Sequence, residues 1–187
     1  MRFKNGVMLI TYANSMGKNL NELRQVLDRY FSRAIAGVHI LPFFPSSSDR
    51  GFSPIRYDIV DPEFGTWDDL AGLSQKYFLM YDFMINHLSS NSPQFQDFLK
   101  KKERSPYADM FIRYKNFWPK GEPTTEDIKA IYKRKPRAPF VEAAFKDGTR
   151  EKLWCTFGDD QIDLNIRNET TWKFINNNLL ALARRGA

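Results

Sequence analysis

Three short apolar runs of the sequence are separated by longer stretches in which apolar residues recur at helical spacing. Runs of this length, rich in aromatic and β-branched residues, predict strands buried in a sheet. They cover Val7–Tyr12, Gly37–Phe44 and Phe78–Ile85. Asn19 with Glu22, and Thr66 with Asp69, form capping pairs that predict the starts of two intervening helices. This order of elements, with short connections, predicts right-handed crossovers and a parallel α/β sheet.

The third run extends to His87 and carries three polar residues in an otherwise apolar stretch, which we interpret as a strand buried on both faces. Asp82 and Asn86 are four positions apart, so they would point to one face of a continuous strand. Ligand-binding groups of parallel α/β folds gather at the C-terminal ends of strands. These residues are therefore either part of a functional site or buried polar groups that satisfy one another.

The strand and helix pattern breaks after His87. The segment 88–167 is charged and rich in proline, and it is too long for a plain loop. It contains a charged run over Lys100–Arg104 that we expect on a solvated helix face, and a predicted strand over Lys152–Phe157. The sequence therefore predicts a subdomain inserted between residues 1–87 and a last helix within 168–187. That helix should bury an apolar face, made of Trp172, Ile175, Leu179 and Leu182.

The composition is that of a globular protein, with 187 residues, 42% hydrophobic and 27% charged. The net charge is +6, but the lysines and arginines are interleaved with acidic residues, and the sequence contains no nucleic-acid-binding motif. We therefore expect no nucleic acid partner. Cys155 is the single cysteine, which favours a reducing compartment. The apolar run at the N-terminus is too short for a signal peptide or a membrane span. These features predict a cytoplasmic protein without membrane contact.

Three segments carry a resemblance to a known family. They are Asp82-x-x-x-Asn86-His87, the loop LPFFPSSSDRGF that begins at Leu41, and QIDLN at 161–165. In order and spacing they resemble the conserved segments of the α-amylase family of glycoside hydrolases, and together its sucrose phosphorylase branch. The resemblance implies the N-terminal part of a (β/α)8 TIM barrel, with the first three strands and a small subdomain inserted after the third. The chain is therefore expected to be an N-terminal fragment.

The resemblance also implies a set of substrate-binding residues. Asp49 would accept hydrogen bonds from glucose hydroxyls, although an Asp before Arg-Gly also suits a turn. Phe52 would pack on the apolar face of the glucose, and His87 would donate to a hydroxyl. Phe157 and Gln161 resemble residues that line the acceptor side.

Other polar residues have structural or ambiguous interpretations. His39 lies within a predicted strand and is expected to be structural, and Asp163 and Asn165 are expected to hold the backbone of their loop. Four cations lie among residues 133–137, a density usually seen on a solvated surface. The resemblance places this loop over the acceptor site, where Arg134 and Lys135 would bind inorganic phosphate or the phosphate of sucrose 6'-phosphate.

The function that the resemblance implies is retaining glucosyl transfer from sucrose to phosphate, which yields α-glucose 1-phosphate and fructose. Its partners would be sucrose or sucrose 6'-phosphate and inorganic phosphate, with no cofactor and no metal. The nucleophile and the acid are expected beyond Ala187, so no catalytic residue is assigned and the chain alone is expected to be inactive. A sucrose 6'-phosphate phosphorylase, an α-glucosidase-type hydrolase and a non-catalytic sugar-binding fragment are the alternatives.

Overall fold

The computed structural model describes residues 5–118, 121–133 and 135–187. The chain divides into two compact units. Unit 1 consists of Met1–Phe83 with Asn176–Ala187, and unit 2 consists of Met84–Ile175. The three-part division into 1–87, 88–167 and 168–187 stays a prediction.

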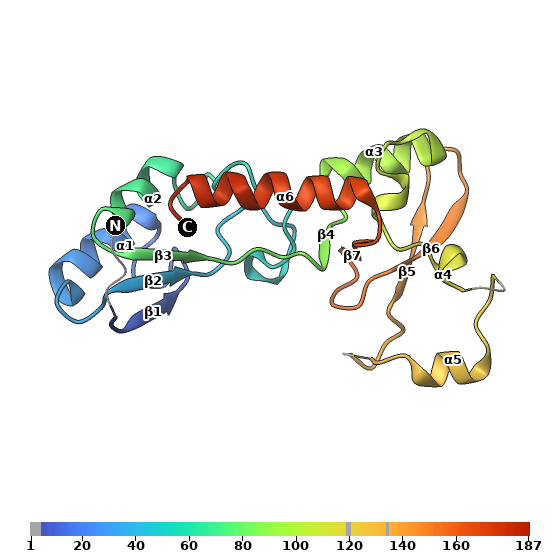
Figure 1. Ribbon diagram of the computed structural model, residues 1–187, viewed down its shortest axis with the longest axis horizontal. Helices are drawn as coiled ribbons and strands as arrows, with labels where there is room; N and C mark the ends of the chain where they lie inside the picture. Colours follow the sequence, from blue (N-terminus) through green and yellow to red (C-terminus); the bar gives the residue numbers. More distant parts are fainter. Residues whose placement is uncertain (1–4, 119–120, 134) are drawn as a thin grey trace. The chain divides into compact units, whose positions relative to one another are not determined.

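Unit 1 contains a three-stranded parallel sheet with the strand order β1-β2-β3 (Figure 1). The strands are β1 (Met8–Thr11), β2 (Gly37–Ile40) and β3 (Phe78–Tyr81). This confirms the predicted parallel α/β sheet. β2 ends before the predicted Phe44, because Pro42 has no N–H with which to continue the ladder.

Two helical segments follow the predicted caps. α1 (Leu20–Val26) begins at Asn19, whose side chain accepts the N–H of Glu22 at 3.0 Å, and it continues as a π-helical turn over Leu27–Phe31. α2 (Trp67–Ser74) begins with a reciprocal capping box between Thr66 and Asp69. Both predicted capping pairs are confirmed.

The sheet is buried on one face, whereas the third apolar run suggested a strand buried on both. The leucines of α1, its π-helical turn and α2 are fully buried together with Val38 and Ile40 of the central strand. Ile10 and Met80 lie in register on either side of His39 and point to the opposite face, where they are 63% and 47% exposed. The prediction of burial on both faces is wrong, because apolar composition does not reveal how many faces a helix covers.

The polar residues of the third apolar run do not share one strand. β3 ends at Tyr81, and the side chain of Asp82 lies 2.9 Å from Nε2 of His39. His87 begins a separate strand, β4 (His87–Ser89), which pairs antiparallel with β7 (Gln161–Asp163). The predicted continuous strand is wrong, because the segment at His87 finds its backbone partners in a strand distant in the sequence.

Unit 2 is built from short helices and strands (Figure 1). Its helices include α3 (Pro93–Lys101), α4 (Tyr114–Phe117) and α5 (Thr125–Ala130), and its hairpin joins β5 (Phe140–Ala144) to β6 (Arg150–Trp154). The rings of Phe95, Phe98, Phe111 and Phe145 pack with centroids 5.0 to 6.2 Å apart. The strand predicted at Lys152–Phe157 begins two residues earlier and ends three residues earlier than expected.

The last helix, α6 (Glu169–Arg184), starts where the side chain of Asn168 accepts the N–H groups of Thr170 and Thr171. Ile175 and Leu182 are buried as predicted, but Trp172 and Leu179 are each 48% exposed. The buried row instead contains Thr171, Ile175 and Leu182. Helical spacing identifies apolar rows, but packing decides which of two neighbouring rows is buried.

Candidate functional site

Asp49 lies in a loop of unit 1 that serine hydrogen bonds hold together. The Ser46 hydroxyl is 2.8 Å from the carbonyl oxygen of Ser48 and 2.7 Å from that of Ser53, and the hydroxyls of Ser47 and Ser53 are 3.0 Å apart. Asp49 is exposed, and its carbonyl oxygen accepts the N–H of Phe52 at 3.1 Å. Asp49 thus occupies the turn that the sequence suggested, and its role as a glucose contact stays a prediction.

The backbone of this loop is left-handed at three consecutive residues. The φ angles are 56° at Asp49, 49° at Arg50 and 99° at Gly51. A non-glycine residue in this region costs roughly 1–2 kcal/mol, and such strain clusters at functional sites. A Cβ on Gly51 would lie 2.6 Å from the carbonyl oxygen of Pro42, so glycine is required there. Phe52, the predicted glucose platform, follows directly.

Arg50 contributes to this loop in a way that sequence reasoning missed. Its guanidinium carbon lies 3.9 Å from the centre of the Tyr12 ring, at the end of β1. A cation over an aromatic face at this distance is stabilising, by about 0.5–1 kcal/mol when exposed. The Arg50 side chain therefore joins the loop carrying Asp49 to the sheet. No local sequence pattern signals a contact between residues so far apart in the chain.

In unit 2, His87 and Phe157 lie together. His87 is 3% exposed, and its imidazole centre is 5.0 Å from the centre of the Phe157 ring. His87 belongs to β4, and Phe157 belongs to the segment between β6 and β7. An imidazole that can donate or accept beside an aromatic ring suits a ligand with both hydroxyl groups and an apolar face.

Asp163 faces His87 across the ladder between β4 and β7. Its carboxylate accepts the N–H of Thr156 at 3.1 and 3.2 Å and the Thr156 hydroxyl at 2.5 Å. Burial raises the pKa of Asp163, and the Thr156 hydrogen bonds and the nearby His87 offset part of that rise. This confirms that Asp163 holds the backbone of its loop.

Gln161 begins β7 and is 1% exposed. Its N–H donates to the carbonyl oxygen of Gly158 at 3.1 Å, which closes a turn after Phe157. A Cβ on Gly158 would come within 2.7 Å of Oε1 of Gln161, so this glycine makes room for the amide. Asn165, also expected to be structural, donates to the carbonyl oxygen of Asp109 at 3.1 Å.

The four cations of residues 133–137 do not form one solvated group. Lys133 and Lys135 are exposed, and Arg134 lies outside the described residues. Arg137 bonds to the protein, with Nη2 donating to the Cys155 carbonyl oxygen at 3.0 Å and Nε 3.0 Å from the Asp159 carboxylate. The solvated interpretation is therefore wrong for Arg137, because the distant Cys155–Asp159 segment lies within its reach.

The comparison with family models assigns the chain to a protein family. Residues 12–186 match the family described as alpha amylase, catalytic domain. The chain belongs to the α-amylase family. The match includes Asp49, Phe52, His87, Phe157 and Gln161, and it confirms the family that the three sequence segments suggested.

Phosphorylases of the α-amylase family are similar over nearly the whole chain. Sucrose phosphorylase of Streptococcus mutans is 53% identical over 182 residues, which are 97% of this chain and 38% of that protein. Glucosylglycerol phosphorylase of Marinobacter adhaerens is 42% identical and is covered to 38% of its length. The crystal structure of sucrose 6F-phosphate phosphorylase from Thermoanaerobacter thermosaccharolyticum superposes with a TM-score of 0.94 at 42% identity, over 100% of this chain and 39% of that one. The expected N-terminal barrel segment is thereby confirmed as the fold class.

His39 has a hydrogen-bond partner, as predicted for a structural histidine, since its Nε2 lies 2.9 Å from Oδ2 of Asp82. The side chains of both residues are partly buried, with 19% and 24% exposed. Asp82, which the sequence grouped with His87, is thus hydrogen-bonded to a residue of unit 1, whereas His87 belongs to unit 2.

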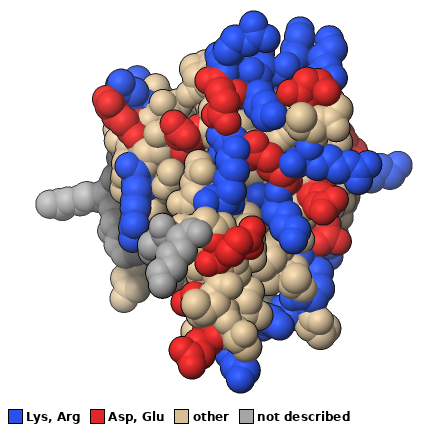
Figure 2. Space-filling model, turned by 90° about the vertical axis from the view of Figure 1, so that its right-hand side faces the viewer, with Lys and Arg blue, Asp and Glu red and all other residues tan. Residues whose placement is uncertain are grey.

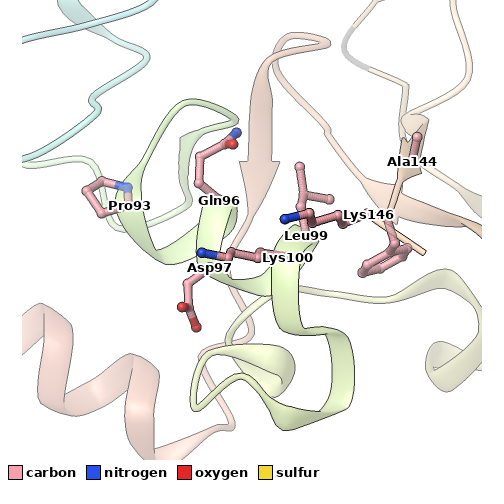
Figure 3. A pocket seen from close by; sticks show the side chains of 8 residues that line it. Pro93, Gln96, Asp97, Leu99, Lys100, Ala144 and Lys146 are labelled. Carbon is pink, nitrogen blue, oxygen red and sulfur yellow. The ribbon is translucent and has the colours of Figure 1, made fainter. Parts of the chain in front are cut away.

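A hollow of about 550 Å³ on unit 2 contains none of the predicted site residues (Figure 3). It is lined by α3 and by the end of β5, with Gln96, Asp97, Lys100 and Lys146 at its walls. Phe145 also lines it but is 4% exposed and presents no open ring to a sugar. The hollow therefore lacks the combination of ring and hydrogen-bonding groups seen at His87.

Cations and anions are interleaved on the surface. Figure 2 shows Lys and Arg side chains beside Asp and Glu side chains on the face it presents. Ion pairs in unit 2 include Lys101 with Asp97 at 2.6 Å and Lys102 with Asp147 at 3.4 Å. The absence of a nucleic acid partner stays a prediction. Among the described residues, no helix combines the length and apolar character needed to cross a membrane.

Proposed function

We propose that this chain supplies part of the substrate pocket of a sucrose phosphorylase, which transfers glucose from sucrose to inorganic phosphate with retention. The observation that carries the proposal is the pairing of buried His87 with the Phe157 ring at 5.0 Å, beside the turn that ends at Gln161. The similarity to sucrose phosphorylase of Streptococcus mutans supports the substrate class.

In the proposed reaction, a carboxylate attacks the anomeric carbon of sucrose while a carboxylic acid protonates the departing fructosyl oxygen. Phosphate then attacks the glucosyl-enzyme and releases α-glucose 1-phosphate. The family resemblance puts both carboxyl groups on barrel strands later than β3. The residues of this chain therefore bind and orient: Asp49, Phe52 and His87 toward the glucose, Phe157 and Gln161 toward the acceptor, and Lys135 toward phosphate.

A phosphorylated sugar is the second candidate substrate. The sucrose 6F-phosphate phosphorylase with a TM-score of 0.94 favours it, together with the exposed cations Lys133 and Lys135. A phosphate group carries about two negative charges near pH 7. Arg134 stays a sequence-based candidate for its recognition.

The test is a graft in which residues 6–186 of this chain replace the matching segment of the Streptococcus mutans enzyme. Formation of glucose 1-phosphate is measured with sucrose, sucrose 6'-phosphate and glucosylglycerol, each at fixed phosphate. We expect turnover of sucrose. A preference for sucrose 6'-phosphate selects the second candidate, and release of free glucose without glucose 1-phosphate contradicts the proposal.

The graft also tests Lys135. Lys135→Ala should raise the KM for phosphate about tenfold, the equivalent of losing one charge-assisted hydrogen bond. Lys129→Ala, an exposed lysine on α5, is the matched control and should leave that KM unchanged. Equal behaviour of the two variants would remove Lys135 from the phosphate site.

A further inference from the structure

Arg137 connects two segments of unit 2 that the proposed function uses. Its Nη1 donates to the carbonyl oxygen of Ala138 at 2.8 Å, which fixes the side chain against its own loop. Its Nη2 donates to the carbonyl oxygen of Cys155 at 3.0 Å, with Nη1 3.5 Å from Sγ of the same residue. Its Nε lies 3.0 Å from the Asp159 carboxylate.

The two residues that Arg137 contacts on the second segment flank Phe157. Cys155 is fully buried, and its N–H donates to the carbonyl oxygen of Pro139 at 2.9 Å, so the start of the segment is anchored. Asp159 is exposed and follows Phe157 by two positions. Arg137 therefore contacts this segment on both sides of Phe157.

The same guanidinium contacts the loop that carries Lys135, through its hydrogen bond to the Ala138 carbonyl oxygen. Lys135 precedes Arg137 by two residues and is exposed. Because a planar guanidinium presents several donors in a fixed fork, it can hold two partners at once in one geometry. A lysine would offer a single point charge at this position and could not reproduce the bridge.

We infer that Arg137 is a positioning residue, a clip that holds the Phe157 loop against the Lys135 loop and so sets the acceptor side of the pocket. This inference rests on the proposed function for its catalytic consequence, whereas the clip itself is a property of unit 2. Arg137 acts on residues that bind the acceptor, Phe157 and Lys135, and not on the reacting atoms. Its loss should therefore raise KM for the acceptor more than it lowers kcat.

The first test uses the 187-residue chain and needs no activity. Cys155 is the only cysteine, so the rate of its reaction with a thiol reagent such as dithiobisnitrobenzoate reports the opening of this loop. Burial raises the pKa of Cys155 and Arg137 opposes that rise, so deleting the cation by itself would make the thiol less reactive. Faster labelling of Arg137→Ala would therefore report exposure and not charge.

We expect Arg137→Ala to label about tenfold faster than the parent chain, the equivalent of 1.4 kcal/mol in the opening equilibrium. Arg137→Gln keeps an N–H donor for the Cys155 carbonyl and should fall between the two. Arg150→Ala is the matched control, because Arg150 is an exposed arginine 3.6 Å from Glu142 in the same unit. Urea midpoints of all variants separate local opening from general destabilisation. Equal labelling of Arg137→Ala and Arg150→Ala would overturn the clip.

The second test uses the Streptococcus mutans graft. Arg137→Ala should raise the KM for phosphate about tenfold with kcat within about twofold, and Arg137→Gln should restore part of the loss. A graft that is inactive before any substitution contradicts the proposed function and leaves the labelling result to decide the clip. An active graft whose kinetics do not change in Arg137→Ala contradicts the positioning role.

Discussion

Arg113 should contribute strongly to the stability of unit 2. Its side chain is 2% exposed, and its guanidinium donates to Glu103 and Glu151 at distances between 2.6 and 2.9 Å. Arg113→Met removes the cation and leaves Glu151, whose side chain is 10% exposed, facing Lys115 at 2.9 Å. Removing one partner of a buried ion pair costs about 3–5 kcal/mol, mostly as the penalty of the remaining charge.

Urea unfolding followed by tryptophan fluorescence measures this loss. With a slope of about 2 kcal/mol per molar urea, the expected loss lowers the unfolding midpoint by roughly 1.5–2.5 M. Lys115→Met is the matched control. Its side chain is 52% exposed, and pairs of this kind contribute about 0–1 kcal/mol. The double variant Arg113→Met/Glu151→Gln should recover part of the loss, since it removes the buried Glu151 charge, which in Arg113→Met keeps, among the described residues, only the exposed Lys115 as a partner.

Low pH should reduce the stability that Arg113 contributes. Burial alone would raise the pKa of Glu151, but the hydrogen bonds and the positive charges of Arg113 and Lys115 together outweigh burial and lower that pKa. A carboxyl group with a lowered folded pKa contributes stability above its ordinary value of 4.5 and loses it as the pH falls through the folded value. The difference in unfolding free energy between the parent chain and Arg113→Met should therefore narrow as the pH falls through the folded pKa of Glu151.

An Arg113→Met variant whose urea midpoint at pH 7 shifts by less than about 0.5 M would show that the network is not a buried ion pair in solution.

Three further outcomes follow from the described residues. Gly51→Ala should lower the unfolding free energy by more than about 2 kcal/mol, because the cost of a left-handed backbone adds to a clash with the backbone of Pro42. Gly148→Ala, with φ +83° and nothing within 4 Å of its Cβ, should show only the cost of the left-handed backbone. Equal losses in the two variants would refute the clash. The purified 187-residue chain should release no glucose 1-phosphate from sucrose, and release above a mock preparation would contradict the assignment of the catalytic carboxyls to later strands. The chain should also self-associate in sedimentation, because Ile10 and Leu180 are 63% and 54% exposed; a monomer with a sharp thermal transition would disprove this.

The sequence predicted much of the fold because local rules specify it. Short apolar runs located the three strands of the parallel sheet in unit 1, and capping pairs located the helices α1 and α2. Backbone capping at Asn19 and Thr66 depends only on residues three positions away. The ordered conserved segments identified the family for the same reason. They are contiguous strings that keep their meaning without tertiary context.

Contacts between distant segments decided the remainder. The apolar run at Phe78–His87 is split because His87 pairs with Asp163, a residue far along the chain, and a strand's partner is not visible in its own sequence. Within α6, tertiary packing selected Thr171 over Trp172 for burial.

Arg137 and Arg50 show the same division at the level of single side chains. The sequence determined that both are cations in polar loops, which by composition alone predicts solvated charges. Only the tertiary structure decided that one reaches Cys155 and Asp159 and that the other covers the Tyr12 ring. A long, flexible side chain takes its partner from whatever the fold brings within a few ångströms, and that proximity is a property of the packed chain.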